Sequence, residues 1–293
     1  MSYGIELIDA TPDWLDVPFL ATYLVYGERN VLVDSGVKSS SEKLIRALSG
    51  RDFTEIDYVL THIHIDHVSG LGYIHDRFKG YVYLHPRAVE HVSNPSKLWS
   101  AAKDALGEFA ELYGEPKPVD EKYLVPVSNG MIIPSGGELM FIYTPGHASH
   151  HISIYHKDSD GLFVGDSAGI YINQFEYVIP TTIYPCRLDL YMISLRRMKL
   201  LKPSLLYYAH YGIAEDGWRK IDELYKRVRE WSKVASDERD IDSYTKYIVD
   251  NDETFKKIYV NLDSLPLAKI LVDLALKGIY EEVRRDPELP NKF

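Results

Sequence analysis

The segment Thr61-His62-Ile63-His64-Ile65-Asp66-His67 brings four side chains with nitrogen or oxygen donor atoms into a run of six residues. It directly follows residues 57–60, an apolar run with the composition of a β-strand. The two isoleucines can anchor the segment in a core while the polar side chains converge outside it. Histidine and aspartate supply ligands that Zn²⁺ accepts. The segment therefore predicts a metal site on a loop between a strand and a helix.

Four further motifs place a histidine or an aspartate beside an apolar, strand-like run. They are Val31-Leu32-Val33-Asp34-Ser35-Gly36, Thr144-Pro145-Gly146-His147, Leu162-Phe163-Val164-Gly165-Asp166-Ser167 and Tyr207-Tyr208-Ala209-His210-Tyr211-Gly212. Together with the HxHxDH segment, they resemble the motifs of the metallo-β-lactamase-fold superfamily in number and order. The resemblance extends over most of residues 4–213. It implies an α/β (α+β) fold, the four-layer αββα sandwich of two mixed sheets, with metal ions at one sheet edge.

The resemblance also implies a ligand set for two divalent metal ions. One ion would be bound by His62, His64 and His147, the other by Asp66, His67 and His210, with Asp166 bridging the two. We expect zinc, with iron or manganese as alternatives because His/Asp sites bind all three. Two ions can share a water molecule and lower its pKa toward about 7, which makes hydroxide available at neutral pH. Asp66 is expected to be catalytic as well, by accepting or relaying a proton.

Other polar residues are expected to play lesser parts. In the resembled family the residue at Asp34 supports the metal loop without binding metal, and metal-bound histidines need such partners. His151 matches a family position that hydrogen-bonds near the site, with a plain buried histidine as the alternative. We interpret Cys186 as an inert thiol. The remaining histidines are interpreted as structural or solvated; they are His75, His85, His91, His150 and His156.

Aromatic residues after Asp166 are candidates for a substrate pocket, because in the resembled family this stretch lies beside the metal ions. They are Tyr171, Phe175, Tyr177 and Tyr184, and a tyrosine hydroxyl there can serve as an oxyanion donor. The insertion at residues 87–118 and the C-terminal helices can cover the site. Trp99, Phe109 and Trp218 are the candidates for that apolar cover.

Hydrophobic periodicity predicts a mixed α/β body followed by a helical region. Strands are expected at 19–26, 31–34, 57–61, 81–85, 123–126, 139–143, 152–156, 161–164 and, as the final strand, 204–209. Helices are expected at 40–48, 87–113 and 188–200, and then at 215–235, 240–250 and 264–285. We therefore predict a catalytic domain at residues 1–213 and an α-helical C-terminal region at residues 214–293.

Composition limits the environment and the partners of the chain. Its 293 residues carry a formal net charge of −10, which disfavours nucleic acid, and no apolar run is long enough to span a membrane. A single cysteine cannot form an internal disulfide, which together with the absence of a recognisable secretion signal predicts a cytoplasmic protein. One glutamine and one cysteine among abundant charged residues resemble the bias of thermophilic proteins.

The expected function is hydrolysis of an ester, thioester or lactone carbonyl by a metal-bound hydroxide. The helical C-terminal region resembles the glyoxalase II branch of the superfamily, whereas lactonases share the same ligands, so both branches stay open. The alternative is a mononuclear iron enzyme like the persulfide dioxygenases, and phosphodiester cleavage by a nuclease is disfavoured by the net charge. The expected partner is a small-molecule substrate. Residues 265–280 form an amphipathic run that can pack on the body or in a homodimer.

Overall fold

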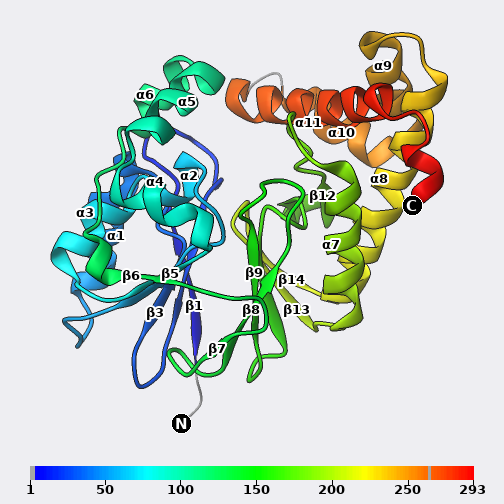
Figure 1. The fold of residues 1–293 in the computed structure, drawn as a ribbon. Coiled ribbons are helices and arrows are strands. Elements are labelled where there is room, and N and C mark those ends of the chain that lie inside the picture. Colours follow the sequence, from blue (N-terminus) through cyan, green and yellow to red (C-terminus); the bar gives the residue numbers. More distant parts are fainter. Residues whose placement is uncertain (1–3, 263–264) are drawn as a thin grey trace.

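Two six-stranded sheets lie face to face, and helices cover the outer side of each (Figure 1). The computed structural model describes residues 4–262 and 265–293. Large side chains fill the space between the sheets, among them Tyr23 and Val59 from the first sheet and Phe141 and Phe163 from the second. This arrangement confirms the αββα sandwich expected from the sequence.

The first sheet holds its strands in chain order. They are β1 (Ile5–Asp9), β2 (Ala21–Val25), β3 (Val31–Val33), β4 (Asp57–Val59), β5 (Val82–Leu84) and β6 (Leu124–Pro126). The β2–β3 hairpin is antiparallel as its polar turn predicts, and β3 to β6 are parallel. Strand β1 adds an antiparallel edge to β2 that the sequence did not indicate.

The second sheet has the order β14-β13-β10-β9-β8-β7. Its strands are β7 (Ile132–Ile133), β8 (Leu139–Tyr143), β9 (Ile152–His156), β10 (Gly161–Gly165), β13 (Leu205–Tyr208) and β14 (Gly212–Glu215). Strand β14 lies beyond the strand expected to be the last. Its residues alternate between buried and exposed, and Gly212 and Glu215 have low strand propensity, so this edge strand left no clear sequence pattern. A separate ribbon joins β11 (Ile170–Ile172) and β12 (Tyr177–Ile179).

Helices α1 (Ser41–Ser49), α2 (Ile65–Val68) and α3 (Leu71–Arg77) pack on the first sheet. The stretch 87–113, expected as one helix, is divided into α4 (Val89–Ser93), α5 (Ser96–Leu106) and α6 (Glu108–Tyr113). Pro95 stands at the start of α5, and Gly107 between α5 and α6 has a φ of 56°. Proline and a left-handed glycine both end helices, which explains the division.

The second sheet is covered by α7 (Leu188–Leu200) and α8 (Gly217–Asp237). Helices α9 (Ile241–Asn251), α10 (Glu253–Asn261) and α11 (Pro266–Arg285) extend the same hydrophobic core beyond α8. Helix α10 was not expected from the sequence. Residue 264, the expected start of the last helix, lies outside the described residues. No helix in the described parts of the chain combines the length and apolarity needed to cross a membrane. The division of the chain at residue 213 stays a prediction.

Helix α11 connects the two outer layers. Its first turn contributes Leu267 to the core beneath the helices of the first sheet, whereas Leu276 and Ile279 belong to the core of the second. Figure 1 shows α11 running across the end of the sandwich toward α5 and α6. The helix therefore lies over the edge at which the predicted metal site is expected.

Candidate metal centre

The predicted site residues lie at one edge of the sandwich, where strands of both sheets end. Asp34 follows β3, and the segment 62–67 follows its parallel neighbour β4. In the second sheet, Asp166 follows β10, and His210 lies just beyond β13, which runs parallel to β10. Parallel neighbours end at the same edge, where loops beyond the carboxyl ends of strands commonly form binding sites. Loops distant in sequence therefore meet there.

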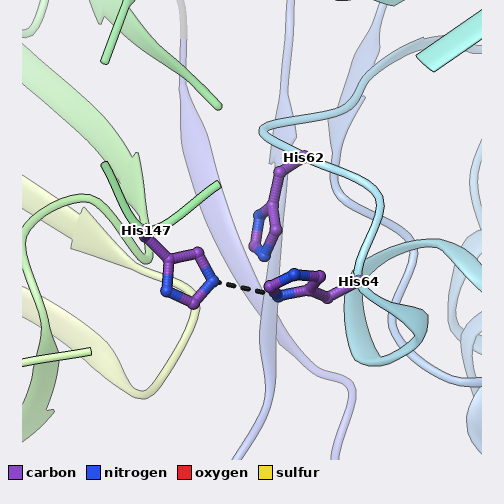
Figure 2. Close-up of side chains that lie close together, drawn as sticks. All are labelled: His62, His64 and His147. Atoms are coloured by element: carbon purple, nitrogen blue, oxygen red, sulfur yellow. Dashed lines mark hydrogen bonds between the residues drawn. The ribbon is translucent and has the colours of Figure 1, made fainter. Parts of the chain in front are cut away.

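The structure brings all seven predicted ligands together. Figure 2 shows His62, His64 and His147 with their rings turned toward a common point, and Nε2 of His147 lies 2.9 Å from Nδ1 of His64. In each of three groups, the donor atoms lie within 4.8 Å of one another. The groups are His62, His64 and His147; His62, His67 and Asp166; and Asp66, His67 and His210.

Carboxylate oxygens join these groups. Nε2 of His147 lies 3.3 Å from Oδ2 of Asp166, and Nε2 of His67 lies 3.4 Å from its Oδ1. On the other side, Nε2 of His210 lies 3.3 Å from Oδ2 of Asp66. Asp166 thus stands between histidines of two different groups, which is the position expected of a bridging ligand.

Three buried atoms at this centre lack a hydrogen-bond partner among the described residues. They are Nε2 of His62, Nε2 of His67 and Oδ1 of Asp166. Buried polar atoms are rarely left unsatisfied, since each one destabilises the fold by about 1–3 kcal/mol. Cations bound by these two imidazole nitrogens and shared by this carboxylate oxygen would satisfy all three. The donor set therefore fits a divalent metal, and its nitrogen and oxygen atoms suit zinc, iron and manganese alike.

Hydrogen bonds hold three of the histidines with Nε2 toward the centre. Nδ1 of His147 donates to the carbonyl of Thr181 at 2.7 Å, and Nδ1 of His210 donates to the carbonyl of Phe19 at 3.1 Å. Nδ1 of His67 lies 2.9 Å from Oδ2 of Asp34. Because a carbonyl can only accept, the first two bonds fix the proton on Nδ1 and leave the Nε2 lone pair free for a metal ion.

Asp34 supports the metal loop, as expected. Its Oδ1 accepts from the backbone N–H of Thr61 at 2.8 Å, and its Oδ2 accepts from the Thr61 hydroxyl at 2.7 Å. The same carboxylate faces His67, so it connects both ends of the segment 61–67. Asp34 has a φ of 57°, a left-handed conformation that aspartate tolerates better than most residues.

His151 is buried beside the centre, where the family resemblance placed it. Its Nε2 accepts from the backbone N–H of Asp166 at 3.1 Å, and its Nδ1 lies 2.9 Å from the Thr144 hydroxyl. Gly165, with a φ of 48°, makes this approach possible, because a Cβ there would lie 2.7 Å from both His151 Nε2 and Thr61 Oγ1. The glycine before the bridging aspartate therefore lets the loops of both sheets close on each other.

The electrostatics of the centre favour a cation. Burial raises the pKa of Asp66, but His67 and His210 outweigh it and lower that pKa to about 2. Burial also opposes protonation of His67, yet the carboxylates of Asp66 and Asp166 raise its pKa above the usual value. His62 behaves in the opposite way, because burial and the neighbouring His67 lower its pKa. The carboxylates thus attract positive charge to one point, and His62 stays neutral as a metal ligand requires.

A cavity of about 570 Å³ opens beside these residues. His64, Asp66 and His147 form part of its wall, and so do Asp166 and His210. Of the four aromatic candidates, Tyr184 lines this cavity, but Tyr171, Phe175 and Tyr177 do not belong to its described lining. Tyr171 stacks on Tyr208, and Tyr177 donates to Asp252 at 2.6 Å, so both support the fold instead. Trp99, Phe109 and Trp218 are likewise absent from the described lining.

Two titratable side chains of the described lining were not expected there. Tyr113 ends α6, and its hydroxyl is buried without a hydrogen-bond partner among the described residues. Burial and the charges of Asp66 and Asp166 raise its pKa, so it is protonated and able to donate. His150 also lines the cavity, where its Nε2 accepts from the backbone N–H of Ile63 at 3.2 Å. Neither residue belongs to a motif, so only the fold brings them to the site.

Cys186 is buried, and burial raises the pKa of its thiol to about 12, which agrees with an inert role. His75 and His156 hydrogen-bond the carbonyls of Gly80 and Gly136, and His85 accepts from the backbone N–H of Arg87. These residues have structural roles, as the sequence suggested.

The model of the metallo-beta-lactamase superfamily matches residues 17–210, a span that contains all seven residues of the centre. The chain belongs to the metallo-β-lactamase superfamily. Protein ST1585 of Sulfurisphaera tokodaii, named as a metallo-beta-lactamase fold-containing protein, is 37% identical over 218 residues, which are 72% of this chain and 79% of that protein. YflN of Bacillus subtilis, which is named a probable metallo-hydrolase, is 25% identical over 223 residues. These are 70% of this chain and 83% of YflN.

Solved structures of superfamily proteins agree with this assignment. The structure of ST1585 has a TM-score of 0.66 at 32% identity and covers 77% of this chain and 86% of its own. Superfamily protein TTHA1429 from Thermus thermophilus also has a TM-score of 0.66, at 19% identity, and covers 97% and 94% of the two chains. At that identity the second likeness shows the fold alone, but it extends into the C-terminal helices.

Proposed function

We propose that the chain is a metal-dependent hydrolase that holds two divalent ions, zinc by preference. His62, His64 and His147 would bind one ion, Asp66, His67 and His210 the other, and Asp166 would bridge them. The observation that carries this proposal is the set of three converging donor groups with three unpartnered buried atoms between them. When bound, the ions would supply Lewis acidity and acidify a water molecule near neutral pH.

The residues around the ions suit attack on a carbonyl. Asp66 lines the cavity as a carboxylate and can accept a proton there. The Tyr113 hydroxyl, which needs a partner, can donate to the oxygen of a substrate. Among the described lining residues there is no lysine or arginine to pair with a phosphate, so an ester, thioester or lactone fits better than a phosphodiester.

Metal analysis distinguishes this proposal from a mononuclear iron dioxygenase. We expect about two zinc ions per chain in protein purified without added metal, and a marked loss in the Asp66→Ala, His210→Ala double variant. A His91→Ala, Asp120→Ala double variant, whose residues lie outside the three donor groups, is the matched control. Hydrolysis is then screened with neutral esters, thioesters and lactones. One iron per chain, unchanged in the first variant and accompanied by oxygen uptake, would overturn the proposal.

A further inference from the structure

The cavity has a second, apolar end that the metal centre does not use. Helix α5 contributes Leu98, Ala102 and Leu106 to it, and α11 contributes Leu271 and Leu274. The 181–185 loop adds Ile183, Tyr184 and Pro185. These segments come from the 87–118 insertion, the C-terminal region and the loop after β12. We call this end the apolar chamber.

The charge of the lining restricts what the chamber can accept. Within the described part of the chain, every carboxylate of the cavity wall belongs to the metal centre, and no lysine or arginine reaches the wall. A terminal carboxylate or phosphate in the chamber would lose its hydration without gaining a counter-ion, which is strongly unfavourable. The part of a ligand that enters the chamber is therefore uncharged.

The elements that carry the lining residues give that ligand a direction. The polar residues of the metal centre stand on loops and the short helix α2 at the strand ends, whereas every lining leucine, and every lining alanine except Ala148, stands on α5 or α11, which lie over that edge (Figure 1). If the reactive group of a ligand lies at the metal centre, a chain attached to that group extends into the apolar chamber. The volume of about 570 Å³ lies in the range of sites that enclose small molecules.

We propose that the apolar chamber binds the acyl chain of an uncharged ester, thioester or lactone whose carbonyl lies at the metal centre. This inference rests on the proposed function for the chemistry of the carbonyl. The chamber itself selects for an apolar chain with no terminal charge. Each buried methylene is expected to improve binding by about fourfold until the chamber is full.

A chain-length series tests the selection. We expect kcat/KM for neutral thioesters with one leaving group to rise from acetyl to octanoyl by at least about a hundredfold. An acyl chain of the same length that ends in a carboxylate should lose most of that gain. A flat or falling series, or equal rates for the carboxylated chain, would overturn the proposal.

Variants on α11 locate the effect. Leu274→Asp should sharply lower the octanoyl-to-acetyl ratio of kcat/KM, because it places a charge in the chamber. Ile270→Asp is the matched control, since Ile270 lies on the same helix, is 41% exposed and is absent from the described lining. Should Leu274→Asp fail to fold, Leu271→Ala replaces it and should move the optimum toward longer chains. An equal ratio in the wild type and both chamber variants contradicts the assignment.

Binding without turnover separates this inference from the proposed function. Neutral primary amides from butanamide to octanamide are used as probes in calorimetry with the metal-loaded protein. Affinity that rises with chain length and falls in Leu274→Asp supports the chamber even if no ester is hydrolysed, in which case only the proposed function fails. Ester hydrolysis together with chain-independent amide binding overturns the chamber and leaves the hydrolase intact.

Discussion

Asp34 connects the metal loop to the first sheet through one carboxylate. It accepts two hydrogen bonds from Thr61 and faces Nδ1 of His67, and it is almost completely buried. Burial opposes protonation of His67, but the charge of Asp34 adds to the larger effects of Asp66 and Asp166 in raising the pKa of His67 above the usual value. The residue therefore orients one proposed ligand and adds negative charge behind it, without lining the cavity itself.

Asp34→Asn should lower metal affinity by about 10- to 100-fold, as loss of a partner behind a metal ligand commonly does. The physical reason is that asparagine keeps only one accepting oxygen, has an NH2 donor in place of the other, and carries no charge. Competition with a chromogenic chelator measures the affinity. Asp57→Asn is the control. Asp57 is also buried, but its carboxylate accepts two hydrogen bonds of 2.7 Å each from Arg29 and takes no part in the metal centre. This substitution should reduce stability and leave metal affinity within about twofold. Equal affinities for wild type and Asp34→Asn would contradict the assigned role.

The Tyr113 hydroxyl gives a second prediction at this scale. Since the hydroxyl has no partner in the described structure, Tyr113→Phe should leave the free energy of unfolding unchanged or raise it slightly. If the hydroxyl donates to substrate, kcat/KM for a hydrolysed ester should fall about tenfold. Tyr58→Phe is the matched control, since its hydroxyl donates to the Phe78 carbonyl at 2.6 Å in the core. That variant should lose stability and keep its activity; the reverse pattern would rule out the catalytic role.

The sequence predicted the converging ligands because each stands in a short motif at a strand end, where its type and its neighbours are informative. Tyr113 and His150 carry no such pattern. Tyr113 reaches the cavity because α6 folds over the site, and His150 because the loop between β8 and β9 turns back on Ile63. Tyr171 and Tyr177 were candidates for the pocket because the family resemblance places their stretch beside the metal ions, but the β11–β12 ribbon directs them into the second core.

Elements were predictable where burial is complete. Strands β2, β3 and β10 are buried along their whole length and read as apolar runs in the sequence. Strand β14 gave no apolar pattern because its buried positions are Gly212 and Ala214, whereas Ile213 is exposed, and helix α10 buries only Phe255 and Ile258 among its nine residues. The stretch 87–113 forms three helices because Pro95 and Gly107 interrupt it. Its apolar residues keep the spacing of one continuous helix, so the sequence pattern did not indicate the breaks.

The docking of α11 depends on a glycine. A Cβ on Gly278 would lie 1.5 Å from the carbonyl oxygen of Thr182, so the backbones of α11 and the 181–185 loop are in direct contact. The Thr182 hydroxyl also donates to the Ala275 carbonyl at 2.8 Å. Because this loop carries Thr181, Ile183 and Tyr184 to the cavity, the position of α11 fixes one of its walls.

Gly278→Ala should therefore lower the free energy of unfolding by about 2 kcal/mol or more, since backbone has to move to admit the methyl group. Urea denaturation with comparison of midpoint and slope measures the change. Gly50→Ala is the control, because its Cβ meets nothing within 4 Å and its φ of −77° is ordinary. That variant should stay within about 0.5 kcal/mol of the wild type. If both variants behave alike, the close contact of α11 does not determine stability.

At the scale of the whole molecule, the metal centre lies where the two halves of the sandwich meet. The first sheet supplies the segment 62–67, the second supplies His147, Asp166 and His210, and α11 spans both helical layers. Without a cation, the carboxylates of Asp34, Asp66 and Asp166 repel one another across this seam. Metal binding should thus stabilise the assembled sandwich and not merely a local loop.

Metal removal should consequently lower the melting midpoint of the entire chain. A ligand at about a thousand times its dissociation constant contributes about 4 kcal/mol, so chelation should shift the midpoint by several degrees and added zinc should restore it. The scarcity of glutamine and cysteine among many charged residues leads us to expect a metal-loaded midpoint above the mesophile range of roughly 45–65 °C. The Asp66→Ala, His210→Ala variant should respond less to chelator, because one proposed ion is already lost. Equal melting midpoints with and without metal would show that metal binding does not stabilise the fold. A midpoint in the mesophile range with zinc bound would contradict only the expected heat adaptation.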